Sequence, residues 1–169
     1  PLWTPTFALC ALALGTAATV ACSSGGTRYG APEQVVGNPL PEVEGASIES
    51  IEGETRANGA AEDACTVRVL WATWCPSCKT EMLQLGPWLD ELAAPPNVEL
   101  VHIDPNISAT DILLFLGTYR IAFPAIAGIA GTRSAHGVST IPTLFIADEE
   151  GIVQHTHTGL HTQTSFSAA

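Results

Sequence analysis

Two cysteines separated by two residues, Cys75 and Cys78, lie where a strand-like segment gives way to a helix-like one. Residues 67–71 (VRVLW) have the β-branched and aromatic content of a strand. Residues 75–94 carry apolar side chains at helical spacing, with Pro76 in the first turn, and this predicts an amphipathic helix. The apolar positions are Met82, Leu85, Leu89 and Leu92. The cysteine pair is therefore predicted to occupy the first turn of a helix that follows a strand.

The rest of the chain predicts helices packed against a mixed sheet. Ser108 or Thr110 can cap a second helix. Residues 35–51 are expected to form a leading segment or hairpin at the edge of the sheet. The later predicted elements are a strand at 98–104, a helix ending at Tyr119, and strands at 143–147 and 152–158 joined by a turn at 148–151. This order favours an α/β layered fold, with one domain at residues 35–169.

The position of the cysteine pair determines its chemistry. A disulfide and a shared metal ion are both compatible with the spacing. At a helix N-terminus, however, unpaired backbone N–H groups and the positive end of the helix dipole stabilise an anion on Cys75. The Cys75 thiolate can then attack an external disulfide, and Cys78, one turn further in, can resolve the mixed disulfide. Pro76 fixes the backbone of this turn, and Trp74 offers an apolar surface beside the sulfur.

The roles of two further residues, Glu81 and Pro142, cannot be decided from the sequence pattern alone. Glu81 lies three positions after Cys78, on the same side of the predicted helix. A partly buried carboxylate there could exchange a proton with the resolving thiol, whereas a solvent-facing one would have no such role. Pro142 precedes the strand at 143–147, where a proline is structurally tolerated and by itself indicates little.

The N-terminal segment predicts export. Residues 7–20 form an apolar run that is too short to span a bilayer but is typical of a secretory signal. The following Ala21-Cys22-Ser23 resembles the cleavage and lipidation site of bacterial lipoproteins. We therefore expect a signal peptide at residues 1–21, acylation at Cys22 and a lipid-anchored tether, rich in Gly and Ser, at residues 22–34.

A family resemblance supports this interpretation. Residues 71–82 (WATWCPSCKTEM) are similar to the W-A-T-W-C-x-x-C-x-x-E-M motif of the TlpA/ResA-type thiol-disulfide oxidoreductases, which are extracytoplasmic, AhpC/TSA-related and thioredoxin-like. The same family is also similar at residues 141–143, at the turn at 148–151 and at residues 36–41. The resemblance covers about residues 35–160. Val69 stands where thioredoxins themselves have a buried aspartate, which argues against a cytosolic thioredoxin.

The resemblance also implies roles for individual residues. It implies that the Ile141–Pro142 bond is cis and faces Cys75, so that the Ile141 backbone can pair with an extended substrate segment. It implies that Glu81 is the active-site acid. We expect Trp74 and Pro76 to contact the substrate as well. The family's proline two residues after the glutamate is replaced here by Leu83. The final helix of the fold is poorly represented after Gly159, so we expect either a truncated C-terminal helix or a thinly covered face of the sheet.

The net charge argues against two classes of partner. Six Lys and Arg residues against 17 Asp and Glu give a formal net charge of −11. Nucleic acids and anionic lipid headgroups both require clustered cations, so neither is an expected partner. Membrane attachment must then come from an apolar or covalent anchor.

Two other functions compete with the oxidoreductase interpretation. A peroxiredoxin-type peroxidase needs a hydroxyl three residues before the reactive cysteine, and Thr73 is only two before Cys75. A copper or zinc module could use the cysteine pair with His102 or His136. For His155, His157 and His161 we expect an exposed polar edge. Cys65 is interpreted as a buried free thiol, with an intermolecular contact or a further resolving role as alternatives.

The sequence thus predicts an exported, lipid-anchored dithiol/disulfide oxidoreductase without an organic cofactor or a metal. Its partners are expected to be disulfide-containing or dithiol proteins and an electron donor. Glu81 and the Pro-Ser dipeptide between the cysteines resemble the reductases of the family, so reduction is the expected direction.

Overall fold

The computed structural model describes residues 28–48, 64–90 and 96–161. The predicted signal peptide at residues 1–21 and the predicted lipidation site at Cys22 lie outside these ranges. None of the helices within the described ranges is long and apolar enough to cross a membrane.

A six-stranded mixed sheet forms the centre of the fold, in the order β1-β4-β3-β2-β5-β6. Strands β2, β3 and β4 run parallel, and β1, β5 and β6 pair antiparallel to their neighbours. The strands are β1 (Gly45–Ile48), β2 (Thr66–Trp71), β3 (Asn97–His102), β4 (Ala125–Gly128), β5 (Thr143–Ala147) and β6 (Val153–Thr158). The mixed α/β sheet predicted from the sequence is confirmed.

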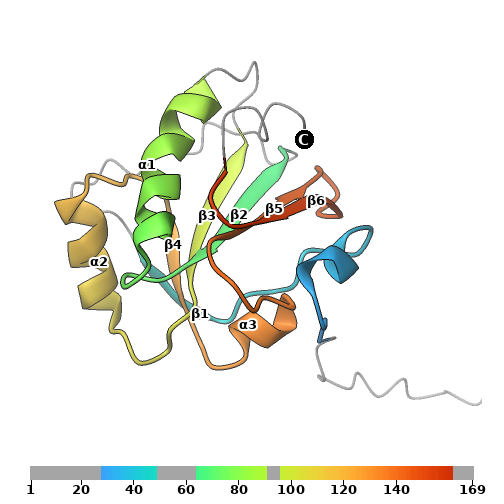
Figure 1. Ribbon diagram of the computed structural model, residues 1–169, viewed down its shortest axis with the longest axis horizontal. Coiled ribbons are helices and arrows are strands. Elements are labelled where there is room, and N and C mark those ends of the chain that lie inside the picture. Colours follow the sequence, from blue (N-terminus) through green and yellow to red (C-terminus); the bar gives the residue numbers. More distant parts are fainter. Residues whose placement is uncertain (1–27, 49–63, 91–95, 162–169) are drawn as a thin grey trace, which may run out of the picture.

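Helices cover both faces of this sheet. Figure 1 shows α1 (Pro76–Asp90) and α2 (Ala109–Thr118) side by side on one face, with α3 (Thr132–Ala135) and the 3₁₀ helix η1 (Pro32–Val35) on the other. This is the arrangement expected when β2-α1-β3 and β3-α2-β4 are both right-handed crossovers in the same direction. The Lys79 ammonium lies 4.6 Å from the ring centre of Tyr119 and links α1 to the end of α2.

Most predicted elements are present, with boundaries shifted by a few residues. Ser108, one of the two predicted caps, accepts a hydrogen bond from the Asp111 backbone N–H at the start of α2. Strand β4 is absent from the sequence prediction. Its four residues (AIAG) have little β-branched content, and they form a strand because β1 and β3 pair with their backbone from both sides.

The N-terminal part of the domain is also more ordered than its composition suggests. Regular structure begins at Pro32, inside the predicted tether, and the Val35 side chain is fully buried. The expected leading segment contributes β1 at one edge of the sheet. At the other edge, Pro39 pairs with Ile152 just before β6. The segment therefore spans both edges of the sheet.

Helix α1 buries one side against the sheet. The buried positions on this side are Cys78, Glu81, Met82, Leu85, Trp88 and Leu89. Their spacing of three and four residues is that of an amphipathic helix, as predicted. Five of the six are apolar or thiol side chains, and the sixth is the carboxylate of Glu81. A buried carboxyl group within an apolar stripe requires a hydrogen-bonding partner, and this partner belongs to the site described next.

Candidate active site

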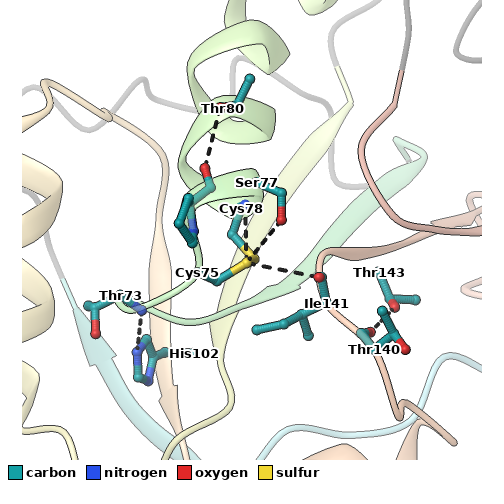
Figure 2. Close-up of a disulfide and its surroundings, with 10 residues drawn as sticks. Thr73, Cys75, Ser77, Cys78, Thr80, His102, Thr140, Ile141 and Thr143 are labelled. Carbon is teal, nitrogen blue, oxygen red and sulfur yellow. Dashed lines mark hydrogen bonds between the residues drawn. A yellow bond between two sulfur atoms is a disulfide. The ribbon is translucent and has the colours of Figure 1, made fainter.

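The two cysteines form a disulfide at the point where β2 ends and α1 begins (Figure 2). Their Cα atoms are 5.3 Å apart. Cys75 retains 6% of its surface and Cys78 retains none. A partner can therefore reach Cys75 first, which agrees with its predicted role as the attacking sulfur.

Three groups surround the sulfur of Cys75. The backbone N–H of Cys78, one of the unpaired amides of the first turn of α1, donates to Sγ at 3.2 Å. The Ser77 hydroxyl lies 3.4 Å from Sγ and can donate to a thiolate there. The Ile141 carbonyl oxygen lies 3.9 Å away. Two donors directed at one sulfur would stabilise its anion in the reduced protein.

The segment before β5 faces this sulfur, as the resemblance implied. The Ile141–Pro142 peptide bond is cis. Figure 2 shows Ile141 next to the disulfide, and the Thr143 hydroxyl donates to the Thr140 carbonyl across the proline at 2.7 Å. Ile141 is half-buried and Pro142 buried. The structure thus brings together sequence positions separated by more than 60 residues at one end of the sheet.

Trp74 provides an apolar surface beside the disulfide and is 57% exposed. Its indole N–H donates to the carboxylate of Asp104 at 3.0 Å. The backbone N–H of Asn106 and the indole N–H of Trp74 both donate to this carboxylate and hold the pKa of Asp104 below its ordinary value. Pro76 is exposed next to the same surface.

His102 holds the loop that precedes Cys75. The backbone N–H of Thr73 donates to its Nε2 at 3.1 Å, as drawn in Figure 2, and its ring packs edge-on against Trp71. Burial lowers the pKa of His102, so the neutral ring persists at neutral pH. Sequence reasoning considered His102 only as a metal ligand and did not consider Asp104. Their positions at the carboxyl end of β3, beside the parallel strand β2, are the signal that could have indicated their proximity to the cysteines.

Glu81 is fully buried, so the solvent-facing alternative is wrong. Its Oε2 accepts the backbone N–H of His161 at 2.8 Å, and its Oε1 is in contact with Nδ1 of the same histidine. His161 is only 3% exposed, which contradicts the expected exposed edge at this residue. Sequence reasoning did not connect these residues because they are 80 positions apart.

The histidines that could complete a metal site are engaged elsewhere. Nε2 of His102 accepts the backbone N–H of Thr73, and its Nδ1 lies 3.3 Å from the backbone nitrogen of Asp104. The ring of His136 lies between the Thr132 carbonyl and the Arg68 guanidinium. Across residues 28–48, 64–90 and 96–161, no three His, Cys, Asp or Glu side chains are grouped so as to hold a metal ion.

Cys65 is a free and exposed cysteine at the start of β2. Its interpretation as a buried thiol is therefore wrong. The residue precedes β2, whereas Cys75 follows the other end of the same strand, so the two cysteines lie at opposite ends of it.

Comparisons with known proteins agree with this geometry. Residues 36–156 match the model of the AhpC/TSA family. The chain is 29% identical over 118 residues to the thioredoxin-like protein YneN of Bacillus subtilis, covering 69% of each protein. It is 28% identical over 130 residues to the thiol-disulfide oxidoreductase ResA of Halalkalibacterium halodurans, covering 76% of this chain and 69% of ResA.

The crystal structure of StoA from Bacillus subtilis shares the fold, with a TM-score of 0.56 and 24% identity over 77% of this chain and 97% of StoA. The family match covers most of the described domain, and the motif that carried the resemblance lies inside it. The chain belongs to the AhpC/TSA family, and within it is a thioredoxin-like thiol-disulfide oxidoreductase of the TlpA/ResA type.

Proposed function

We propose that this oxidoreductase reduces disulfides in proteins outside the cytoplasm, with Cys75 as the nucleophile and Cys78 as the resolving thiol. The observation that carries the proposal is the geometry at Cys75. Its sulfur accepts an amide N–H of the first helical turn at 3.2 Å and lies next to the Ile141 carbonyl. A thiolate stabilised beside an open backbone acceptor is suited to an extended disulfide-containing segment.

The reaction proceeds by two exchanges. The Cys75 thiolate attacks one sulfur of the substrate disulfide, which forms a mixed disulfide and releases the other substrate sulfur as a thiolate. Cys78 then loses its proton and attacks the Cys75 sulfur, which forms the Cys75–Cys78 disulfide and releases the second substrate sulfur. The substrate gains two electrons and two protons. An external dithiol donor restores the reduced enzyme by the reverse exchange.

The substrate would bind across a surface formed by Trp74, Pro76, Ile141 and Pro142. Trp74 is 57% exposed and is held by Asp104, so the ring is ordered before a substrate arrives. The cis bond before Pro142 places the Ile141 carbonyl beside the sulfur. An extended segment could donate a backbone N–H to that carbonyl while its sulfur approaches Cys75.

The reductive direction is supported by the groups around Cys75. Its recorded contacts within the described residues are an amide, a hydroxyl and a carbonyl, with no cationic side chain among them. A cation at this place would stabilise the thiolate further and make the disulfide a stronger oxidant. Ser77 contributes a neutral hydroxyl instead, and this favours a reducing couple.

Export and anchoring complete the proposal. The apolar run at 7–20 would direct the chain out of the cytoplasm, with cleavage after residue 21 and acylation of Cys22. The residues from Cys22 up to η1, which begins at Pro32, would then link the lipid to the domain. The client proteins would be other exported proteins, because disulfides persist outside the cytoplasm.

The reduction potential of the Cys75–Cys78 couple tests the proposed direction. We would replace Cys10, Cys22 and Cys65 by serine, equilibrate the chain in glutathione and dithiothreitol buffers, and measure the fraction of free Cys75 thiol. We expect a potential more negative than about −200 mV, toward the value of thioredoxin at about −270 mV. A potential less negative than about −200 mV contradicts the reductase assignment, and the absence of a reversible couple contradicts the whole proposal.

A further inference from the structure

His161 contacts both carboxylate oxygens of Glu81. Its backbone N–H donates to Oε2 at 2.8 Å and its Nδ1 contacts Oε1. Both side chains are almost completely removed from solvent, at 0% and 3% exposure of the two residues. The segment that carries His161 is held at its beginning by the Gly159 backbone N–H, which donates to the Pro142 carbonyl at 2.8 Å. The carboxylate is therefore fixed in place by a residue from the far end of the domain.

The contact requires a shared proton. A carboxylate oxygen and an imidazole nitrogen at hydrogen-bond distance would repel each other if both presented only lone pairs. A proton on either atom, donated to the other, removes this repulsion. Such a contact also compensates the buried carboxyl group, because an unpaired buried charge costs several kcal/mol. The Nε2 atom of His161 is also buried and makes no hydrogen bond within the described residues.

A second histidine lies next to this pair. The ring centre of His157, on β6, lies 4.0 Å from that of His161. His157 is half-buried and thus in contact with solvent, whereas His161 is buried. Burial lowers the pKa of His157, with further lowering by the charges of His161 and His155 and an opposing effect of Glu81. A largely neutral imidazole beside the pair can accept a proton and release it.

We propose that His161 positions Glu81 and shares its proton, and that the pair takes up the proton that Cys78 loses when it resolves the mixed disulfide. This inference rests on the proposed function and adds to it a residue outside the matched motif. Cys78 and Glu81 are both fully buried and lie one turn apart on the same side of α1. The titratable groups around the pair are Cys78 on α1 and His155 and His157 on β6.

The step is balanced as follows. The Cys78 thiol gives its proton to the Glu81–His161 pair, and its sulfur attacks Cys75 Sγ and forms the internal disulfide. The electron pair of the bond from Cys75 to the substrate sulfur leaves with that sulfur as a thiolate. The pair, which now carries one extra proton, returns to its starting state by passing a proton by way of His157 to water and to the released thiolate. No further oxidant or reductant is needed.

Reaction with 5,5′-dithiobis(2-nitrobenzoate) separates the two exchanges. In the reduced chain with Cys10, Cys22 and Cys65 replaced by serine, the attack of Cys75 releases one coloured thionitrobenzoate. The resolution by Cys78 releases a second. The first phase reports the nucleophile, and the second reports the proton transfer that is assigned to the pair.

His161→Asn and His161→Phe are the test variants. The side-chain amide of His161→Asn can still donate to Glu81 but cannot exchange a proton. If His161→Phe fails to fold, His161→Asn alone tests the proposal. We expect an unchanged first phase, a second phase slowed about 100-fold, and a changed pH dependence of the second phase. Glu81→Gln should slow the second phase as well, and adding His161→Asn to it should cause little further loss. Gln154→Asn, a change at an exposed residue of β6 that does not titrate, is the control and should leave both phases as they are.

The outcomes separate the two proposals. A folded His161 variant whose second phase keeps the rate and pH dependence of the unmodified protein overturns the role of His161. Equal slowing of both phases overturns it too, because this indicates a general structural effect. A missing first phase in the unmodified protein would instead contradict the assignment of Cys75 as the nucleophile.

Discussion

Replacing Cys75 by serine is expected to abolish disulfide exchange, with a loss of more than about a thousandfold in rate. The serine hydroxyl stays protonated at neutral pH and is a poor nucleophile toward sulfur. Replacing Cys78 by serine should have a different effect. Cys75 can still attack, but the mixed disulfide cannot be resolved from within the chain, so a covalent adduct with the substrate accumulates. Turnover is lost in both variants, but only Cys78→Ser traps the substrate.

Mass spectrometry of the non-reduced protein after incubation with a disulfide-containing peptide checks this difference. We expect a peptide adduct on Cys75 in the Cys78→Ser variant. We expect no adduct on Cys78 in the Cys75→Ser variant. Cys65→Ser is the matched control because Cys65 lies at the opposite end of β2, and it should keep full activity. An adduct on Cys78 in the Cys75→Ser variant would reverse the assigned roles.

The free energy of unfolding is expected to fall by at least about 2 kcal/mol between about pH 7 and about pH 4.5, chiefly because of His136. This side chain is fully buried. Its Nδ1 lies 2.9 Å from the Thr132 carbonyl oxygen and its Nε2 lies 3.1 Å from the Arg68 guanidinium. The ring therefore donates from Nδ1 and accepts from Arg68 at Nε2, which is the neutral form.

Burial is the main cause that lowers the pKa of His136 to about 4, and the charge of Arg68 lowers it further. In the unfolded chain the ordinary value of about 6.5 applies. As the pH falls below about 6.5, His136 becomes protonated in the unfolded chain but stays neutral in the folded protein. Its contribution to the free energy of unfolding is therefore present above this pH and is lost as the pH falls through about 4. Burial lowers the pKa of His102 as well, and this acts in the same direction.

Urea unfolding followed at several pH values checks this prediction. His136→Gln keeps a group that can accept from Arg68 but does not titrate. Its stability at neutral pH will differ from that of the unmodified protein, so the informative quantity is the change between about pH 7 and about pH 4.5. We expect this change to be smaller by about 2 kcal/mol in the variant. An equal change in both proteins would show that His136 is not the cause.

How far the sequence predicted the structure depended on whether the signal was local. Residues 67–71 and the helix after them were predicted because one short stretch holds both the strand composition and the apolar stripe. Strand β4 was missed because its four residues carry no such pattern and form a strand only between two neighbours. The same reason applies to η1, whose Val35 is buried by contacts with the rest of the domain.

The site divides in the same way. The two cysteines follow from the motif, and the position of Ile141 beside Cys75 followed from the family resemblance. The side of α1 that bears Glu81 could be read from the spacing, but its burial depends on what packs against the helix. The contact of His161 with Glu81 could not be inferred from the residues near Glu81, because His161 lies after β6 in the sequence. His102 and Asp104 required knowledge that β3 lies beside β2.

The central claim is that the first turn of α1 stabilises a thiolate on Cys75. In the reduced chain with Cys10, Cys22 and Cys65 replaced by serine, the rate at which iodoacetamide alkylates Cys75 should be measured as a function of pH, with the modified residue identified by mass spectrometry. We expect the midpoint of this profile at least about one pH unit below the value of about 8.5 for free cysteine. A midpoint at about 8.5 or above would contradict the account.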